Sequence, residues 1–222
     1  MTEPTPATDP AANPAARTTA RVLREIDAVL LRPDAPFTLT SGRQSPVYVD
    51  CRRIISFPRA RAKLMDLACE RILDSVGYES LDAVAGGETA GIPFAAWIAE
   101  RLGLPMVYIR KKPKGFGRNA RIEGHLPEGA RTLLVEDLAT DGGSKVSFID
   151  AVREAGARID HAFVIFHYGI FPQSVETLAA RGVQLHALAT WWDVLAEAGD
   201  TLDAEGLKTI RAFLDAPESW TP

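Results

Sequence analysis

Residues Thr132 to Lys145 read TLLVEDLATDGGSK, in which an apolar run meets two carboxylates and then a turn rich in glycine and hydroxyl groups. The apolar run predicts a buried strand that stops just before Glu136 and Asp137, and Val146 begins the apolar side of a helix. A strand followed at once by a helix is the unit from which parallel sheets are built. The stretch therefore predicts an α/β fold with a polar site where a strand ends.

Strands and helices alternate on both sides of this stretch. We expect strands at residues 81–85, 105–109, 131–135, 162–166 and 183–189, with helices at 92–102, 145–155 and 173–180. Such alternation implies crossover connections and a mostly parallel sheet with helices on both faces. Ligands bind outside the carboxyl ends of the strands in sheets of this kind.

The remaining segments are expected to be additions to this core. Residues 1–18 are rich in Pro, Ala and Thr and predict a disordered tail. Residues 19–57 predict a helix to about Leu31 and then a small strand-loop-strand element. The α/β core is expected over 58–190, and a helical segment over 191–222 is expected to pack near the N-terminal element.

Composition narrows the function classes. The chain has 222 residues, a net charge of −4 and no long block of like charge, which argues against a nucleic-acid or anionic-membrane surface. Cys51 and Cys69 lack metal-ligand spacing, so reduced, metal-free thiols are expected. No secretory signal and no apolar run of roughly 20 residues is apparent. We expect a cytoplasmic protein that binds a small polar ligand.

The turn after the central strand has the composition of an anion site. A helix N-terminus would direct free N–H groups at residues 140–144, whose glycines allow close approach of a phosphate. Glu136 and Asp137 would repel a phosphate but could accept hydrogen bonds from a vicinal diol, so the combination suggests a ribose 5-phosphate. The alternative is that the acids and glycines only terminate a strand. Neither a Walker A loop nor a GxGxxG motif is present.

Several segments together resemble the type I phosphoribosyltransferases, and among these the orotate phosphoribosyltransferases. VEDLATDGGS (135–144) is similar to the phosphoribosyl-pyrophosphate motif of that family. FTLTSGRQSPVYVDCRR (37–53) resembles the N-terminal hood element, and AGGETAGIPFA (85–95) resembles the pyrophosphate loop. RKKPKGFGRNARIEG (110–124) resembles the flexible catalytic loop. The segments follow in the family's order, which is more specific than any single motif.

The resemblance implies roles for individual residues. The residues it implies for phosphoribosyl pyrophosphate are Gly86, Gly87, Glu88, Thr89, Arg110, Lys111, Lys114, Glu136, Asp137, Leu138, Ala139, Thr140, Asp141, Gly142, Gly143 and Ser144. Lys111, Lys114, Glu136 and Asp137 are the implied catalytic residues. Thr140 and His167 are the implied orotate contacts. In this family the basic residues usually reach the pyrophosphate from a neighbouring subunit, which implies a homodimer with shared sites.

Two of these segments also have plainer interpretations. The Gly86-Gly87 turn could simply connect a strand to a helix. The basic segment after Arg110 could be a solvated loop. However, about twenty residues separate the strands here, and connections of that length are usually lids or disordered segments.

The resemblance implies transfer of a phosphoribosyl group from phosphoribosyl pyrophosphate to orotate, in pyrimidine nucleotide biosynthesis. Mg²⁺ is expected to arrive with the pyrophosphate substrate, and no metal-ligating residue is assigned. A purine phosphoribosyltransferase and a non-catalytic sensor of phosphoribosyl pyrophosphate are the alternatives.

Three positions depart from the family's usual pattern. Thr40 stands where many members carry Lys, and Phe116 stands where the catalytic loop often carries His. His167 and Tyr168 stand near the position of an Arg that often meets the base. The candidates for a cation that pairs with the orotate carboxylate are Arg43, Arg52 and Arg118. His186 is expected to be structural.

Overall fold

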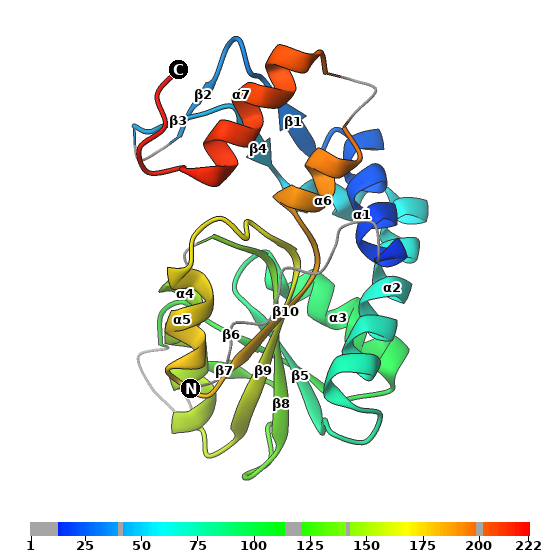
Figure 1. Cartoon of the computed structure of the whole chain (residues 1–222). Helices are drawn as coiled ribbons and strands as arrows, with labels where there is room; N and C mark the ends of the chain where they lie inside the picture. The colour runs from blue at the N-terminus through cyan, green and yellow to red at the C-terminus, as the bar shows by residue number, and fades with distance from the viewer. Residues whose placement is uncertain (1–12, 40–41, 114–120, 141–142, 199–201) are drawn as a thin grey trace.

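The computed structural model describes residues 13–39, 42–113, 121–140, 143–198 and 202–222 (Figure 1). Its centre is a six-stranded sheet in the order β10-β9-β8-β5-β6-β7. The strands are β5 (Ala83–Gly87), β6 (Met106–Ile109), β7 (Ile122–Glu123), β8 (Arg131–Ala139), β9 (Arg158–His167) and β10 (Gln184–Thr190). Neighbouring strands are parallel except for the β6–β7 pair. The predicted mostly parallel sheet is confirmed, and the antiparallel edge strand β7 was not predicted.

Helices cover both faces of the sheet. Helices α2 (Pro58–Val76) and α3 (Gly91–Leu102) lie on one side, and α4 (Gly143–Glu154) and α5 (Gln173–Ala179) lie on the other (Figure 1). In β8, Leu133 and Val135 join the hydrophobic cluster of the first side, whereas Leu134 joins that of the second. Because successive side chains of a strand point to opposite faces, a sheet covered twice requires the uninterrupted apolar runs seen in the sequence.

The N-terminal helix begins and ends earlier than predicted. Helix α1 (Pro14–Glu25) starts where the Asn13 side chain accepts hydrogen bonds from the backbone N–H groups of residues 15 and 16, with Pro14 in the first turn. The expected disordered tail is therefore wrong for residues 14–18, while residues 1–12 lie outside the described part. The helix predicted to reach Leu31 is also wrong, because β1 (Val29–Leu31) pairs with a strand of the hood.

The hood contains the predicted strand-loop-strand element. Strands β2 (Phe37–Thr38) and β3 (Gln44–Ser45) are antiparallel, and β4 (Val47–Val49) pairs with β1. A 3-10 helix, η2 (Cys51–Ser56), then leads to α2. It carries the end of the hood segment over the sheet.

The C-terminal segment forms two helices, α6 (Trp191–Ala196) and α7 (Ala204–Asp215). Its expected proximity to the N-terminal element is confirmed, since Arg17 Nε on α1 lies 2.6 Å from Glu197 Oε1. Apolar residues of α7 share a hydrophobic cluster with the hood strand β4. Within the described residues, no helix is both long enough and apolar enough to cross a membrane.

Strand β8 is longer than predicted. The expected strand stopped at residue 135, whereas the observed strand continues to Ala139 and includes Glu136 and Asp137. The extension arises because β9 is also long and pairs with it, matching Glu136 with Val164 and Leu138 with Phe166. The two acids therefore belong to a rigid strand and not to the turn that follows it.

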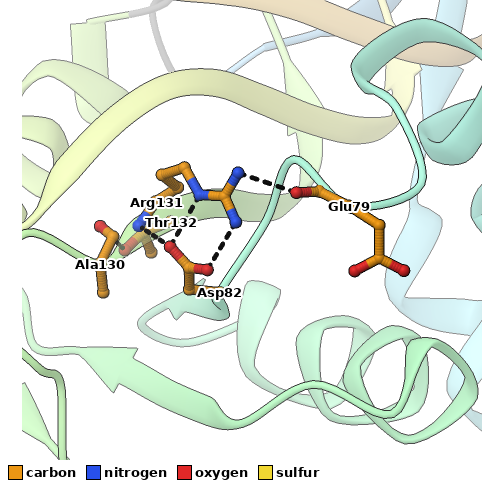
Figure 2. A network of polar contacts seen from close by, with 5 residues as sticks. All are labelled: Glu79, Asp82, Ala130, Arg131 and Thr132. Carbon is orange, nitrogen blue, oxygen red and sulfur yellow. Dashed lines mark hydrogen bonds and ion pairs between the residues drawn. The ribbon is translucent and has the colours of Figure 1, made fainter.

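An ion pair joins the starts of β5 and β8, at the sheet edge opposite the carboxyl ends (Figure 2). Arg131 Nε donates to Asp82 Oδ2 at 2.8 Å, and Arg131 Nη2 donates to Asp82 Oδ1 at 2.7 Å. The remaining guanidinium nitrogen donates to the Glu79 carbonyl at 2.8 Å. The Arg131 side chain holds the pKa of Asp82 well below its usual range. Both side chains are exposed, so the pair adds little to the stability of the fold. We interpret its role as aligning the starts of the two strands.

Candidate active site

A cavity of about 680 Å³ lies where the carboxyl ends of the strands meet the hood. It is lined by Val49, Asp50, Cys51, Arg52, Ile55, Glu88, Thr89, Ala90, Pro93, Lys111, Glu136, Asp137, Leu138, Thr140, Lys145 and Phe148. Three segments far apart in the sequence supply predicted residues to this one space: the hood, the β5–α3 turn and the end of β8. The predicted location at the carboxyl ends of parallel strands follows from the topology.

The end of β5 brings backbone close to the acidic pair. Gly86 and Gly87 are buried strand residues and do not line the cavity, whereas Glu88 and Thr89 do. The peptide between Glu88 and Thr89 is cis. Glu88 Oε2 accepts a hydrogen bond from the backbone N–H of Lys111 at 2.7 Å, which links this turn to the basic segment.

Glu136 and Asp137 are held in a poorly solvated place. Glu136 is only 8% exposed, and burial raises its pKa to about 7, although Lys145 opposes the shift and Asp137 adds to it. Burial also raises the pKa of Asp137, against hydrogen bonds from the backbone and the charges of Lys145 and Arg52. When they are ionised, two adjacent carboxylates with so little solvation need hydrogen bonds, and a polar ligand that replaces water could donate them.

Lys145 is a cavity residue that the sequence did not suggest. No role was predicted for it, yet it lies in the first turn of α4 and is 2% exposed. Its Nζ donates to the Leu138 carbonyl at 2.7 Å and lies 4.0 Å from Glu136 Oε2. The position of this lysine next to the phosphate-loop serine was the only signal in the sequence. Without the fold, the sequence could not show that the side chain points back toward β8.

The basic segment contributes one described residue to the cavity. Lys111 lines it, whereas the Arg110 side chain points to Glu123 on β7, with Nη1 and Oε1 3.4 Å apart. Arg121 Nε donates to the Arg110 carbonyl at 2.9 Å, so the two ends of the segment between β6 and β7 are hydrogen-bonded to each other. Lys114 lies outside the described residues. Lys111 therefore lines the cavity of its own chain, whereas the family resemblance implied a contribution from a neighbouring subunit.

The phosphate loop is described in part. Thr140 lines the cavity, and Ala139 is a buried residue whose carbonyl accepts the backbone N–H of Tyr168 at 2.9 Å. Gly143 begins α4, two residues earlier than predicted, and Ser144 follows it in the helix. Asp141 and Gly142 lie outside the described residues. The helix N-terminus thus follows directly on the loop, as an anion site requires.

Of the residues considered for orotate, some line the cavity and others do not. His167 ends β9, and its Nε2 is 2.7 Å from Ser174 Oγ; it does not line the cavity. Burial, together with the charge of Lys145, lowers the pKa of His167 to about 4, which favours a neutral imidazole. Arg52 lines the cavity and Arg43 does not, while Arg118 lies outside the described residues.

The two cysteines and His186 are buried, and Cys51 also lines the cavity. Cys51 and Cys69 are both free and buried. His186 is buried, and its Nε2 lies 3.1 Å from His161 Nδ1 on the neighbouring strand. This contact between β9 and β10 is consistent with the expected structural role of His186. Among the described residues, no group of three or more His, Cys, Asp or Glu side chains could hold a metal ion.

The fold and the cavity define a protein of the type I phosphoribosyltransferase class, with a parallel sheet, a hood over its carboxyl edge and an acidic pair beside a helix N-terminus. Residues 54–171 match the family described as "Phosphoribosyl transferase domain". The chain is 59% identical to an orotate phosphoribosyltransferase of Cereibacter sphaeroides, over 97% of this chain and 94% of that protein. The chain belongs to the phosphoribosyltransferase family and, within it, to the orotate phosphoribosyltransferases.

Solved structures agree with this placement. The orotate phosphoribosyltransferase from Aeropyrum pernix has a TM-score of 0.71 and 35% identity, covering 82% of this chain and 99% of that one. An orotate phosphoribosyltransferase of Mycobacterium tuberculosis, solved in complex with 5-phospho-alpha-D-ribosyl 1-diphosphate, has a TM-score of 0.63 and 25% identity. That match covers 82% of this chain and 99% of the other.

Proposed function

We propose that this chain transfers the phosphoribosyl group of phosphoribosyl pyrophosphate to N1 of orotate, forming orotidine 5'-monophosphate and pyrophosphate. The observation that carries the proposal is the convergence of Glu136 and Asp137 from β8, Lys111 from the basic segment and Arg52 from the hood on one cavity. These groups match a substrate with ribose hydroxyls, a polyanionic leaving group and a carboxylated base. The identity to orotate phosphoribosyltransferases supports the same substrates.

The cavity residues suit a reaction in which positive charge develops at C1 of the ribose. Glu136 and Asp137 accept hydrogen bonds from the ribose hydroxyls and fix the sugar, while Thr140 and the start of α4 hold its 5-phosphate. The C1–O bond to pyrophosphate breaks and the C1–N1 bond forms, without a covalent intermediate on the protein. Lys111 stabilises the departing pyrophosphate, and Lys114 of the basic segment adds to this role. Arg110 remains a proposed contact to the pyrophosphate, although its side chain pairs with Glu123 outside the cavity in this structure. Mg²⁺ would accompany the pyrophosphate substrate and would neutralise part of the charge that develops on the leaving group.

Arg52 is the proposed partner of the orotate carboxylate. Its Nε donates to Asp50 Oδ1 at 2.8 Å, and its two terminal nitrogens, which have no hydrogen bond to another described residue, could form a bidentate pair. A base without the carboxylate would leave this cation unpaired within the complex, and such unmatched polar groups reject analogues strongly. Thr140 and His167 remain proposed contacts to the base, and His167 would act from behind the cavity wall.

Purified full-length chain supplied with phosphoribosyl pyrophosphate and Mg²⁺ tests the function. We expect loss of orotate and formation of a nucleotide, and little conversion of uracil, adenine, guanine or hypoxanthine. Arg52→Met should raise KM for orotate about tenfold or more, because a charge-assisted pair is lost. The neighbouring Arg53→Met is the control, since Arg53 Nε donates to the Ile26 carbonyl and does not line the cavity.

Two other outcomes would point to the alternatives. Efficient conversion of purines without orotate conversion would make the chain a purine phosphoribosyltransferase. Binding of phosphoribosyl pyrophosphate without turnover of any base would make it a sensor. Equal orotate KM values for Arg52→Met and the native chain would leave the function in place and remove Arg52 from the base site.

We further propose that the chain acts in the cytoplasm as a homodimer with shared active sites. The free, buried thiols Cys51 and Cys69 are typical of a reducing compartment. The resemblance of residues 110–124 to a catalytic loop that reaches a neighbouring subunit supports the sharing of sites. Under this proposal Lys114 would complete the site of the partner, while Lys111 lies beside Glu88 of its own chain.

A further inference from the structure

Lys145 places a buried positive charge beside the cavity, and no step of the proposed reaction uses this charge. It is 2% exposed, although a lysine is almost never fully buried unless it is paired. Its side chain runs from the first turn of α4 back to β8, where its Nζ donates to the Leu138 carbonyl at 2.7 Å. The same ammonium lies 4.0 Å from Glu136 Oε2. It therefore contacts the strand on both sides of Asp137.

The position of the ammonium relative to the acidic pair is fixed by rigid elements. Leu138 pairs with Phe166 of β9, and Glu136 pairs with Val164, so the carbonyl and the carboxylate that face Lys145 belong to a continuous ladder. On the other side, the Glu136 carboxylate lies directly against β5, in the space that a Cβ atom on Gly87 would fill. Lys145 and β5 thus confine the Glu136 side chain from two directions.

We propose that Lys145 is a positioning residue for phosphoribosyl transfer, whose ammonium keeps the buried Glu136 carboxylate charged and aimed at the ribose hydroxyls. This inference rests on the proposed function for the meaning of Glu136, but the charge relation between the two side chains does not depend on it. Lys145 acts through Glu136 and the Leu138 carbonyl and does not itself touch the reacting atoms.

The charges around Glu136 leave Lys145 as the main compensating group. Burial raises the pKa of Glu136, and the adjacent Asp137 raises it further. Lys145 on α4 lowers it most among the described cations, and Lys111 from the segment after β6 lowers it less. Glu88 also lines the cavity, bonded to the Lys111 backbone, and Arg52 from η2 acts on Asp137. Removing Lys145 should therefore leave Glu136 protonated over a wider range of pH.

The pH profile of turnover tests the inference. In Lys145→Met, the acidic limb of kcat/KM for phosphoribosyl pyrophosphate should move upward by about 1–3 pH units, since an opposite charge at this distance is lost. Activity should recover toward the native value at high pH, where Glu136 ionises without help. Lys145→Arg should keep the native limb because it keeps the charge. Lys208→Met removes a 76% exposed lysine of α7 and should change neither the limb nor the rate.

A direct titration separates this inference from the proposed function. In ligand-free protein labelled with ¹³C at glutamate carboxyl groups, the Glu136 signal, assigned by its loss in Glu136→Gln, should titrate at higher pH in Lys145→Met. Lys145→Gln serves if the Met variant does not fold, since it can still donate a hydrogen bond and carries no charge. An unchanged Glu136 titration in either folded, uncharged variant would overturn the inference. A shifted titration in a chain that fails to convert orotate would retain it and reject the function.

Discussion

Gly87 and Glu136 lie against each other across neighbouring strands so closely that no side chain fits between them. A Cβ atom on Gly87 would overlap Glu136 Oε1 and lie 2.7 Å from both Glu136 Cδ and Phe148 Cε2. The family resemblance implied that this glycine binds phosphoribosyl pyrophosphate. The structure gives it a further function, because the glycine leaves space for a buried carboxylate in the middle of a parallel sheet.

Gly87→Ala should displace Glu136 and strongly reduce turnover, with a loss of stability of about 1–3 kcal/mol from overpacking. Kinetics and denaturant unfolding measure the two effects. The control is the double variant Gly87→Ala/Glu136→Ala, in which the cost of the added methyl group should fall. An equal cost in both backgrounds would show that Glu136 is not what the methyl group displaces.

Asp137→Asn should reduce turnover greatly while the chain remains folded. The substitution keeps the shape of a side chain on the cavity wall but removes its charge. The loss of an interaction that orients the transition state would cost about 2–4 kcal/mol in kcat/KM. Steady-state kinetics and circular dichroism measure the two parts. A variant with a native spectrum and undiminished turnover would remove Asp137 from the site.

The native chain should lose stability as pH rises from about 4.5 to 7, relative to Glu136→Gln. The folded chain keeps the Glu136 proton up to a pKa of about 7, whereas the unfolded chain releases it near the ordinary value of 4.5. Protons are therefore bound preferentially by the folded state in this window, so stability is present below it and falls through it. The difference should be on the order of 2–3 kcal/mol. Asp137, whose pKa is also raised, acts with the same sign.

Thermal unfolding across this pH window measures the effect. The Glu136→Gln variant lacks the titrating group and should show a flatter dependence of Tm on pH. Parallel curves for the two proteins would mean that Glu136 titrates normally in the folded state.

Mixed subunits should reveal a shared active site. Lys114→Ala and Asp137→Asn are each expected to be inactive, but a dimer containing one of each would hold one site with both native groups. Subunit exchange, verified by mass spectrometry, should restore part of the activity. Exchange without any recovery would place Lys114 and Asp137 in the same subunit's site.

The architecture was predictable wherever the pattern is local. The alternation of apolar runs and amphipathic stretches predicted every strand of the sheet except the short edge strand β7. The ends of elements were less predictable, as β8 shows: two carboxylates follow its apolar run in the sequence, but β9 offers its last four residues backbone partners. Similarly, residues 29–31 continue a helical spacing, yet β4 recruits them into a strand.

The site was predictable where motifs lie in one segment. The acidic pair, the turn after β5 and the basic segment were all identified, and several of their residues line the cavity. Arg52 was one of three equal candidates until the hood was placed over the sheet. Lys145 was missed because a lysine at the start of a helix is ordinarily a solvated residue.

The sequence by itself determined the class of fold, the location of the phosphate loop and the pair of acids beside it, because side-chain periodicity and turn chemistry are properties of neighbouring residues. Only the tertiary structure decided how those acids are charged. The pKa of Glu136 depends on burial by distant strands and on an ammonium that reaches it from α4. Desolvation and Coulomb interaction act through space, so their balance exists only once the hood, the sheet and the helix are packed together.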